Sequence, residues 1–206
     1  MSEAATGPEP TADEAWARLV AGNDRFLRGE ARAAPTREAL ARLADGQRPY
    51  ATILGCSDSR VPPEWIFDAV PGELFVIRVA GNVISSEIAG SLQYAGSHLR
   101  TPLFVVLGHE GCGAVHAALE TRHRGARHAS RIQALVDNIL PGLSAIDPAC
   151  PPEECLGRAV EWNVRWTVHQ ILNTPEGRAR QEEGRMRIVG AVYEIASGRV
   201  RVLPDR

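Results

Sequence analysis

The 206-residue sequence lacks several features that mark whole classes of protein. It has no run of about 18 apolar residues, which argues against a transmembrane helix and a membrane partner. Its start, MSEAATGPEPTADE, has neither a positively charged segment nor an apolar one, so we expect no signal peptide. Four cysteines are too few for a secreted disulfide scaffold. These absences predict a cytoplasmic protein with reduced thiols.

An excess of charge of either sign is also missing. The chain has 23 basic and 25 acidic residues, a formal net charge of −2 and a pI of about 6.3. Proteins that bind nucleic acid are usually basic, so we expect no nucleic-acid partner. The 44% hydrophobic content is too high for a disordered chain and suffices for a buried core at this length. We therefore predict a single domain over residues 1–206, with residues 1–10 disordered.

The order of the expected elements indicates an α/β fold. Three apolar segments, 50–54, 74–79 and 103–107, have the continuous apolar character of strands in a parallel sheet. Segments 187–195 and 199–203 predict a C-terminal antiparallel hairpin. The expected helices are 11–29, 36–44, 64–69, 85–99, 112–119, 131–146 and 153–172, with a loop at 121–130. The predicted fold is a mostly parallel central β-sheet flanked by helices, with a helical arm over 11–46.

Two motifs rich in reactive side chains each follow an expected strand. The first, G-C-S-D-S-R, occupies residues 55–60, and the second, G-H-E-G-C-G, occupies residues 108–113. In open α/β sheets, ligands bind beyond the carboxyl ends of strands, where the strand order switches. With the strand order 2-1-3, the two motifs face each other. Four side chains then converge on one point: Cys56, Asp58, His109 and Cys112.

These four side chains suit a zinc ion. Zn²⁺ prefers tetrahedral sulfur, nitrogen and oxygen ligands. Arg60 can pair with Asp58 and draw the carboxylate off the metal, which leaves the open position typical of a catalytic site. Water in that position has a pKa of about 7, and Asp58 could orient the resulting hydroxide. Buried structural cysteines, a surface ion pair and a packed glycine-rich turn are the alternative explanation of the same residues.

The motifs resemble the two signatures of the β-class carbonic anhydrases. The matching segments are C-S-D-S-R-V-P-P-E at 56–64 and G-H-E-G-C-G-A at 108–114, with L-F-V-I-R-V-A-G-N at 74–82 between them. The resemblance implies a mostly parallel α/β fold whose N-terminal helical arm wraps a partner subunit.

The resemblance also implies roles for individual residues. Zn²⁺ is bound by Cys56, His109 and Cys112, and Asp58 and Arg60 form a catalytic dyad. Asp58 is either held by Arg60 or bound as a fourth ligand in a closed state. The reaction is the reversible hydration of CO₂ to bicarbonate and a proton, by attack of zinc hydroxide on CO₂.

Further expectations follow from the family. The protein is expected to be a homodimer or a dimer of dimers, with pocket residues near Val61 and 80–82 and others from the partner. Some members regulate a closed site with bicarbonate, using a tryptophan three residues before the first cysteine and an arginine twenty-two after it. Here Ile53 and Arg78 occupy those positions, so half the pattern is missing. We therefore expect an open site at neutral to alkaline pH.

Other functions compete with CO₂ hydration. Relatives with the same ligand set hydrolyse carbon disulfide or carbonyl sulfide, and this is the main alternative. A non-catalytic zinc scaffold is less favoured, because it would need neither Asp58 nor Arg60. A thiol redox protein is disfavoured because the chain has no Cys-x-x-Cys.

Several residues outside the two motifs are weaker candidates for sites. His116, one helical turn after Cys112, is a weaker candidate ligand than His109. The C-x₄-C pair Cys150 and Cys155 is expected to be reduced rather than a disulfide or a second metal site. His123 and His128 are expected to be solvated loop residues rather than proton relays.

Overall fold

The computed structural model describes residues 10–32, 34–147, 149–184 and 186–204. The strands are β1 (Ala51–Gly55), β2 (Leu74–Arg78), β3 (Leu103–His109), β4 (Arg187–Tyr193) and β5 (Val200–Val202). The helices are α1 (Ala12–Arg28), α2 (Arg37–Leu43), α3 (Pro63–Ile66), α4 (Ser86–Ser97), α5 (Gly113–Arg124), α6 (Ser130–Ile139), α7 (Pro152–Leu172) and α8 (Pro175–Glu182), with 3₁₀ turns η1 (Ala80–Asn82) and η2 (Leu140–Leu143). Of residues 1–10, which were expected to be disordered, 1–9 lie outside the described residues.

The five strands form one sheet in the order β2-β1-β3-β4-β5. The first four are parallel and β5 is antiparallel to β4, as the sequence predicted. Every residue of β1 and β3 is buried, which explains their continuous apolar character. The chain leaves β1 for β2 on one side and returns to β3 on the other. The switch in strand order therefore lies between β1 and β3.

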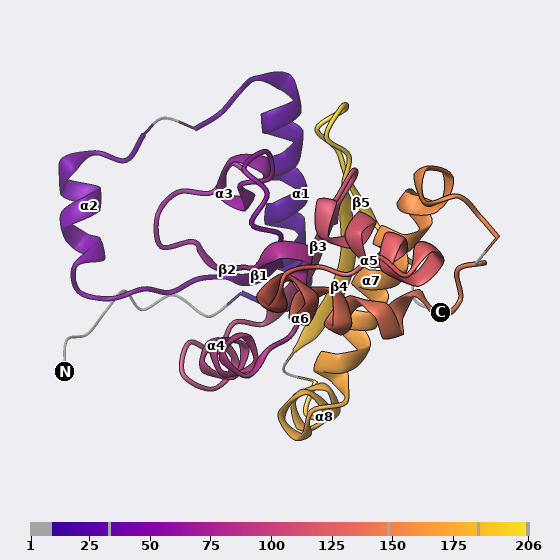
Figure 1. The fold of residues 1–206 in the computed structure, drawn as a ribbon. Helices are drawn as coiled ribbons and strands as arrows, with labels where there is room; N and C mark the ends of the chain where they lie inside the picture. The colour runs from indigo at the N-terminus through magenta and orange to yellow at the C-terminus, as the bar shows by residue number, and fades with distance from the viewer. Residues whose placement is uncertain (1–9, 33, 148, 185, 205–206) are drawn as a thin grey trace.

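Helices cover the sheet on both faces (Figure 1). Helix α1 lies on one side, and α5, α6 and α7 lie on the other, where α7 packs against β3 and β4. A capping box between Thr11 and Glu14 starts α1, and Gly29 in the left-handed conformation ends it. Helix α2 has no buried residue and projects from the rest of the molecule.

Several elements differ from the prediction; α3 and β4, for example, end at Ile66 and Tyr193 rather than at 69 and 195. Helix α5 continues through Arg124 into the expected loop, because basic residues are favourable at a helix C-terminus. Helix α6 ends at Ile139, where Pro141 follows and the chain turns into η2. Helix α8 was not predicted; Thr174 caps it by accepting a hydrogen bond from the Gly177 amide. Strand β3 extends to His109, so this residue lies on the strand itself.

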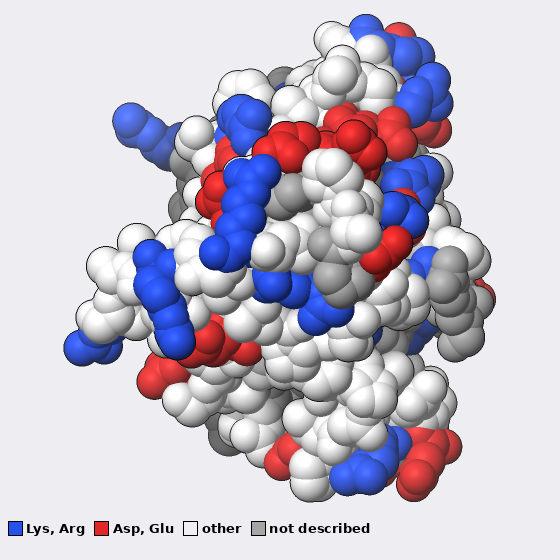
Figure 2. Space-filling view, turned by 45° about the vertical axis from the view of Figure 1, so that its right-hand side comes forward, with Lys and Arg blue, Asp and Glu red and all other residues white. Residues whose placement is uncertain are grey.

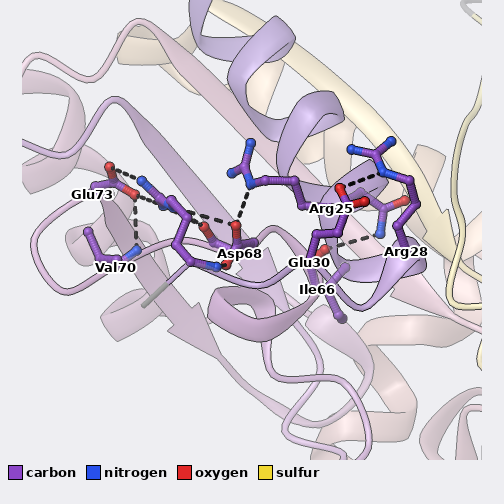
Figure 3. A network of polar contacts seen from close by, with 9 residues as sticks. Arg25, Arg28, Glu30, Ile66, Asp68, Val70 and Glu73 are labelled. Carbon is purple, nitrogen blue, oxygen red and sulfur yellow. Dashed lines mark hydrogen bonds and ion pairs between the residues drawn. The ribbon is translucent and has the colours of Figure 1, made fainter. Parts of the chain in front are cut away.

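A polar network fastens the end of α1 to the segment between α3 and β2 (Figure 3). Arg25 Nε lies 2.5 Å from Asp68 Oδ2, and the Arg32 amide donates to Asp68 Oδ1 at 2.9 Å. Arg32 also pairs with Glu73, Nη1 to Oε1 at 3.0 Å. Burial alone would raise the pKa values of Asp68 and Glu73, but these donors outweigh it and hold both below their usual range.

The molecular surface is mixed in charge. Figure 2 shows one face, on which basic and acidic side chains lie beside one another between stretches of uncharged surface. None of the helices in the described part of the chain is both long and apolar enough to cross a membrane.

Candidate metal centre

Three predicted ligands meet at the switch in strand order. Cys56 directly follows β1, His109 is the last residue of β3, and Cys112 is the N-cap residue of α5. Their ligand atoms all lie within 4.8 Å of one another, and all three residues are buried. Parallel strands end at the same edge of the sheet, so the register of β1 with β3 brings the two motifs together.

The chemistry of this group fits a zinc ion. His109 Nδ1 lies 2.9 Å from the Glu110 carbonyl oxygen, which orients the ring. Its buried Nε2 has no hydrogen-bond partner among the described residues and faces the two thiols. A buried, unpartnered imidazole nitrogen is costly unless a ligand meets it. Two sulfurs and one nitrogen are the donors that zinc prefers, with a fourth position left open.

The two thiols also indicate a cation. The hydrogen bond from the Cys112 thiol outweighs burial and lowers the pKa of Cys56 to about 4. The same contact, together with burial, raises the pKa of Cys112 well above its usual range. The pair therefore carries one negative charge readily and resists a second. A divalent cation between the sulfurs offsets the second charge and allows both thiolates to form.

Asp58 and Arg60 lie beside this group as a two-pronged ion pair. Arg60 Nε donates to Asp58 Oδ1 at 2.9 Å, and Nη2 donates to Oδ2 at 2.7 Å. The backbone amide of Arg60 donates to Oδ1 at 3.0 Å. These hydrogen bonds hold the pKa of Asp58 well below its usual range. Asp58 Oδ2 lies 3.9 Å from His109 Nε2, so the carboxylate faces the ligand group while Arg60 holds it.

Arg78 holds the loop that carries Cys56 and Asp58. Its Nε donates to the Cys56 carbonyl at 2.9 Å, and its Nη2 donates to the Asp58 carbonyl at 2.6 Å. At the sequence level, Arg78 has a role only as the arginine of the bicarbonate-binding pattern, in which the tryptophan is missing. Its position on β2, paired in register with Gly55, explains how it reaches this loop.

A second support comes from α7, a helix to which sequence reasoning gave no part in the site. The Gly81 amide donates to Cys56 Sγ at 3.4 Å. Asn163 Nδ2 donates to the Gly81 carbonyl at 2.8 Å, and Thr167 Oγ1 donates to the Asn82 carbonyl at 3.2 Å. Gly81 has a φ of +71°, and a side chain there would meet Ile139. Nothing in the local sequence links Asn163 to a turn 82 residues earlier.

The weaker candidates lie elsewhere. His116 belongs to no ligand group with Cys112; its Nδ1 lies 3.8 Å from Glu120 on the same helix. His123 lies in α5 and not in a loop, and both its ring nitrogens are buried without a hydrogen-bond partner among the described residues. Cys150 and Cys155 lie outside the ligand group, and no disulfide is present in the described part of the chain.

Comparisons with known proteins agree with this arrangement. The family model described as carbonic anhydrase matches residues 51–200. Carbonic anhydrase 2 of Mycobacterium tuberculosis is 38% identical over 197 residues, covering 93% of this chain and 92% of its own. Carbonic anhydrase of Mycolicibacterium smegmatis is 36% identical over 198 residues, covering 91% of each.

Solved structures give the same match. The Coccomyxa β-carbonic anhydrase in complex with acetazolamide superposes with a TM-score of 0.71 at 26% identity, over 93% of this chain and 83% of its own. A tetrameric β-carbonic anhydrase from Sordaria macrospora superposes with a TM-score of 0.71 at 27% identity, over 81% of this chain and 86% of its own.

Proposed function

Because the chain belongs to the β-class carbonic anhydrase family, we propose that it catalyses the reversible hydration of carbon dioxide to bicarbonate and a proton. One observation carries the proposal for this chain. The buried group Cys56, His109 and Cys112 lies directly beside the Asp58–Arg60 ion pair. A purely structural metal site needs no such pair.

The three buried residues are proposed to hold a zinc ion. When bound, zinc acts as a Lewis acid and lowers the pKa of water to about 7, which makes a strong nucleophile available near neutral pH. The Glu110 carbonyl fixes the His109 ring, and the Gly81 amide donates to Cys56 Sγ. These contacts keep the ligands in place before the metal arrives.

Asp58 is proposed to orient the attacking water. Its carboxylate stays ionised because Arg60 donates to both oxygens, so it can accept a hydrogen bond and aim a lone pair of the water at CO₂. The same hydrogen bonds keep the carboxylate from ligating the metal, which supports an open site. Asp58 can close the site by binding the metal only if its hydrogen bonds with Arg60 break. Carbon dioxide is small and apolar, and buried Val61 next to the dyad offers it an apolar surface.

We further propose that the protein works as a homodimer or a dimer of dimers. The Sordaria relative is described as tetrameric. In this chain, apolar side chains are exposed on α1 and α2, at Val20 (44%) and Leu40 (48%), and on α3, at Trp65 (72%). Contact with a second copy removes this apolar surface from water.

Stopped-flow CO₂ hydration on zinc-loaded protein tests the proposed reaction. The Asp58→Asn variant keeps the shape of the side chain and loses its charge, so we expect hydration to fall about 10²- to 10³-fold. Glu64→Gln, the same change at an exposed residue of α3, should keep native activity.

Native rates in Asp58→Asn would contradict the role of the carboxylate. No hydration by fully zinc-loaded native protein would contradict the reaction, and carbon disulfide and carbonyl sulfide would then be assayed.

A further inference from the structure

A second pair of thiols lies at the start of α7, outside the metal centre. Cys150 precedes the helix and is partly exposed, whereas Cys155 ends its first turn and is fully buried. Neither belongs to the ligand group of Cys56, His109 and Cys112. The CO₂ chemistry proposed above makes no use of this pair.

The two thiols already interact in the reduced protein. Cys155 Sγ lies 3.5 Å from the Cys150 carbonyl oxygen and 3.2 Å from that of Pro151, so its thiol points back toward the residues before the helix. Burial, with a hydrogen bond to the Cys150 side chain, raises the pKa of Cys155 to about 11. Cys155 is therefore a protonated thiol in direct contact with Cys150.

A cation lies beside the exposed sulfur. Arg158, an exposed residue of α7, places Nη2 3.3 Å from Cys150 Sγ. Reactive cysteines attack an oxidant as thiolates and lie in partly exposed, electropositive surroundings such as this one. The pair thus combines an accessible sulfur beside a positive charge with a buried protonated thiol in contact with it. This is the arrangement of an attacking and a resolving cysteine.

We propose that Cys150 and Cys155 form a reversible disulfide in response to a hydroperoxide. The Cys150 thiolate attacks one oxygen of hydrogen peroxide, the O–O bond breaks, and Cys150 sulfenic acid and hydroxide form. Cys155 sulfur then attacks the Cys150 sulfur; the S–O bond breaks, and the sulfenic hydroxyl leaves with the thiol proton as water. Overall two thiols are oxidised and one peroxide is reduced to two waters. A dithiol reductant reverses the reaction by thiol–disulfide exchange.

Peptide mass spectrometry tests the proposal directly. The chain has no lysine, so trypsin cleaves only after arginine and leaves both cysteines in one peptide, residues 132–158. Full-length zinc-loaded protein is treated with hydrogen peroxide, alkylated and digested. We expect the peptide to lose both alkyl labels and to be lighter than the unlabelled reduced peptide by two hydrogens. Treatment with dithiothreitol should restore both labels.

Single variants separate the two roles. In Cys155→Ser, dimedone should label Cys150 after peroxide, because the sulfenic acid has no resolving thiol. In Cys150→Ser, Cys155 should remain an alkylatable thiol. Arg158→Gln should slow disulfide formation, and Arg158→Lys should retain more of the native rate. Circular dichroism verifies that each variant is folded.

The proposal is overturned if the peptide keeps both labels at peroxide concentrations that oxidise Cys56 and Cys112, or if Cys150 resists dimedone in folded Cys155→Ser.

Discussion

The four cysteines show how the surroundings of a side chain determine its chemistry. Cys56 and Cys112 contact each other beside His109 Nε2, a nitrogen without a hydrogen-bond partner in the described part of the chain, and this favours a metal ion. Cys150 and Cys155 also contact each other, but the guanidinium of Arg158 lies beside Cys150, and among the described residues the pair belongs to no metal-ligating group. The surroundings of the first pair suit a bound metal ion, and those of the second pair suit the proposed disulfide.

Zinc binding distinguishes the two pairs. We expect Cys112→Ser to weaken zinc binding by more than about tenfold, since it removes a direct ligand and even a change in an outer contact costs about 10- to 100-fold. Cys150→Ser makes the same change outside the site and should bind zinc normally. The measurement is competition with a chromophoric chelator, with metal content checked by mass spectrometry. Equal affinity in the two variants would contradict the proposed ligand set.

At the scale of residues, the sequence predicted which reactive side chains lie together, but it did not predict the hydrogen bonds that support them. Cys56, His109 and Cys112 could be brought together from strand order alone, because two strand ends determine where they lie. Asn163 and Thr167 could not, because their hydrogen bonds to the η1 turn depend on how α7 is rotated against the sheet. No local sequence pattern indicates how α7 is rotated.

Among the elements, α1 packs closely against the end of α3. Gly22 lies so close to the backbone of Phe67 that a methyl group there would collide with the carbonyl oxygen. The helix therefore depends on a residue that helices otherwise disfavour. The close approach brings Asn23 within reach of the Ile66 carbonyl, to which its Nδ2 donates at 3.0 Å.

A pair of glycine substitutions tests this packing. We expect Gly22→Ala to lower the free energy of unfolding by about 1–3 kcal/mol, because the methyl group forces backbone apart. Gly157→Ala is the control: in α7, no atom of the described residues lies within 4 Å of where its Cβ would be, and alanine there should raise stability by about 0.5–1 kcal/mol. Urea denaturation followed by circular dichroism measures both. A neutral Gly22→Ala would show that α1 does not need this close contact.

The elements that the sequence predicted well are those whose signals are local. Thr11, Glu14 and Gly29 mark both ends of α1. Helix α8 was missed because its residues, PEGRARQE, are almost wholly polar and contain a glycine, so no apolar stripe reveals it. That glycine, Gly177, packs against the Ile171 carbonyl, a contact made only in the folded chain.

For the whole molecule, the network of Asp68 and Glu73 with Arg25 and Arg32 predicts a pH dependence of stability. The folded protein holds the pKa of Asp68 below the ordinary value of about 4. The contribution of the ionised Asp68 to the free energy of unfolding is therefore complete above about pH 4. It is lost as the pH falls further through the pKa of Asp68 in the folded protein. We expect Asp68→Asn to lower the free energy of unfolding by about 1–3 kcal/mol at pH 7.

The difference between Asp68→Asn and the native protein should shrink below about pH 4, in urea unfolding curves recorded from pH 7 to pH 3. Asp24→Asn, at an exposed aspartate of the same helix, should match the native protein throughout. If the two proteins differed by the same free energy of unfolding at every pH, the stabilising effect of Asp68 would not come from its charge.

Assembly gives a second whole-molecule prediction. Val20 on α1 and Val202 on β5 are similarly exposed, at 44% and 42%. If α1 is part of the arm that contacts a second copy, Val20→Asp should shift the protein to monomer in analytical ultracentrifugation and lower CO₂ hydration. Val202→Asp should leave both unchanged. A Val20→Asp monomer with full activity would show that a single chain completes the pocket.

The hydrogen bond from Asn163 to Gly81 also bears on when the site can form during synthesis. The proposed ligands lie between residues 56 and 112, and both motifs leave the ribosome before α7. The η1 turn that donates to Cys56 Sγ receives its hydrogen bonds from α7 only once residues 163–167 emerge and α7 docks. In a nascent chain, two thiols and a histidine thus emerge before the hydrogen bonds from α7 to the η1 turn can form. We therefore expect metal binding, if these residues hold zinc as proposed, to follow the docking of α7.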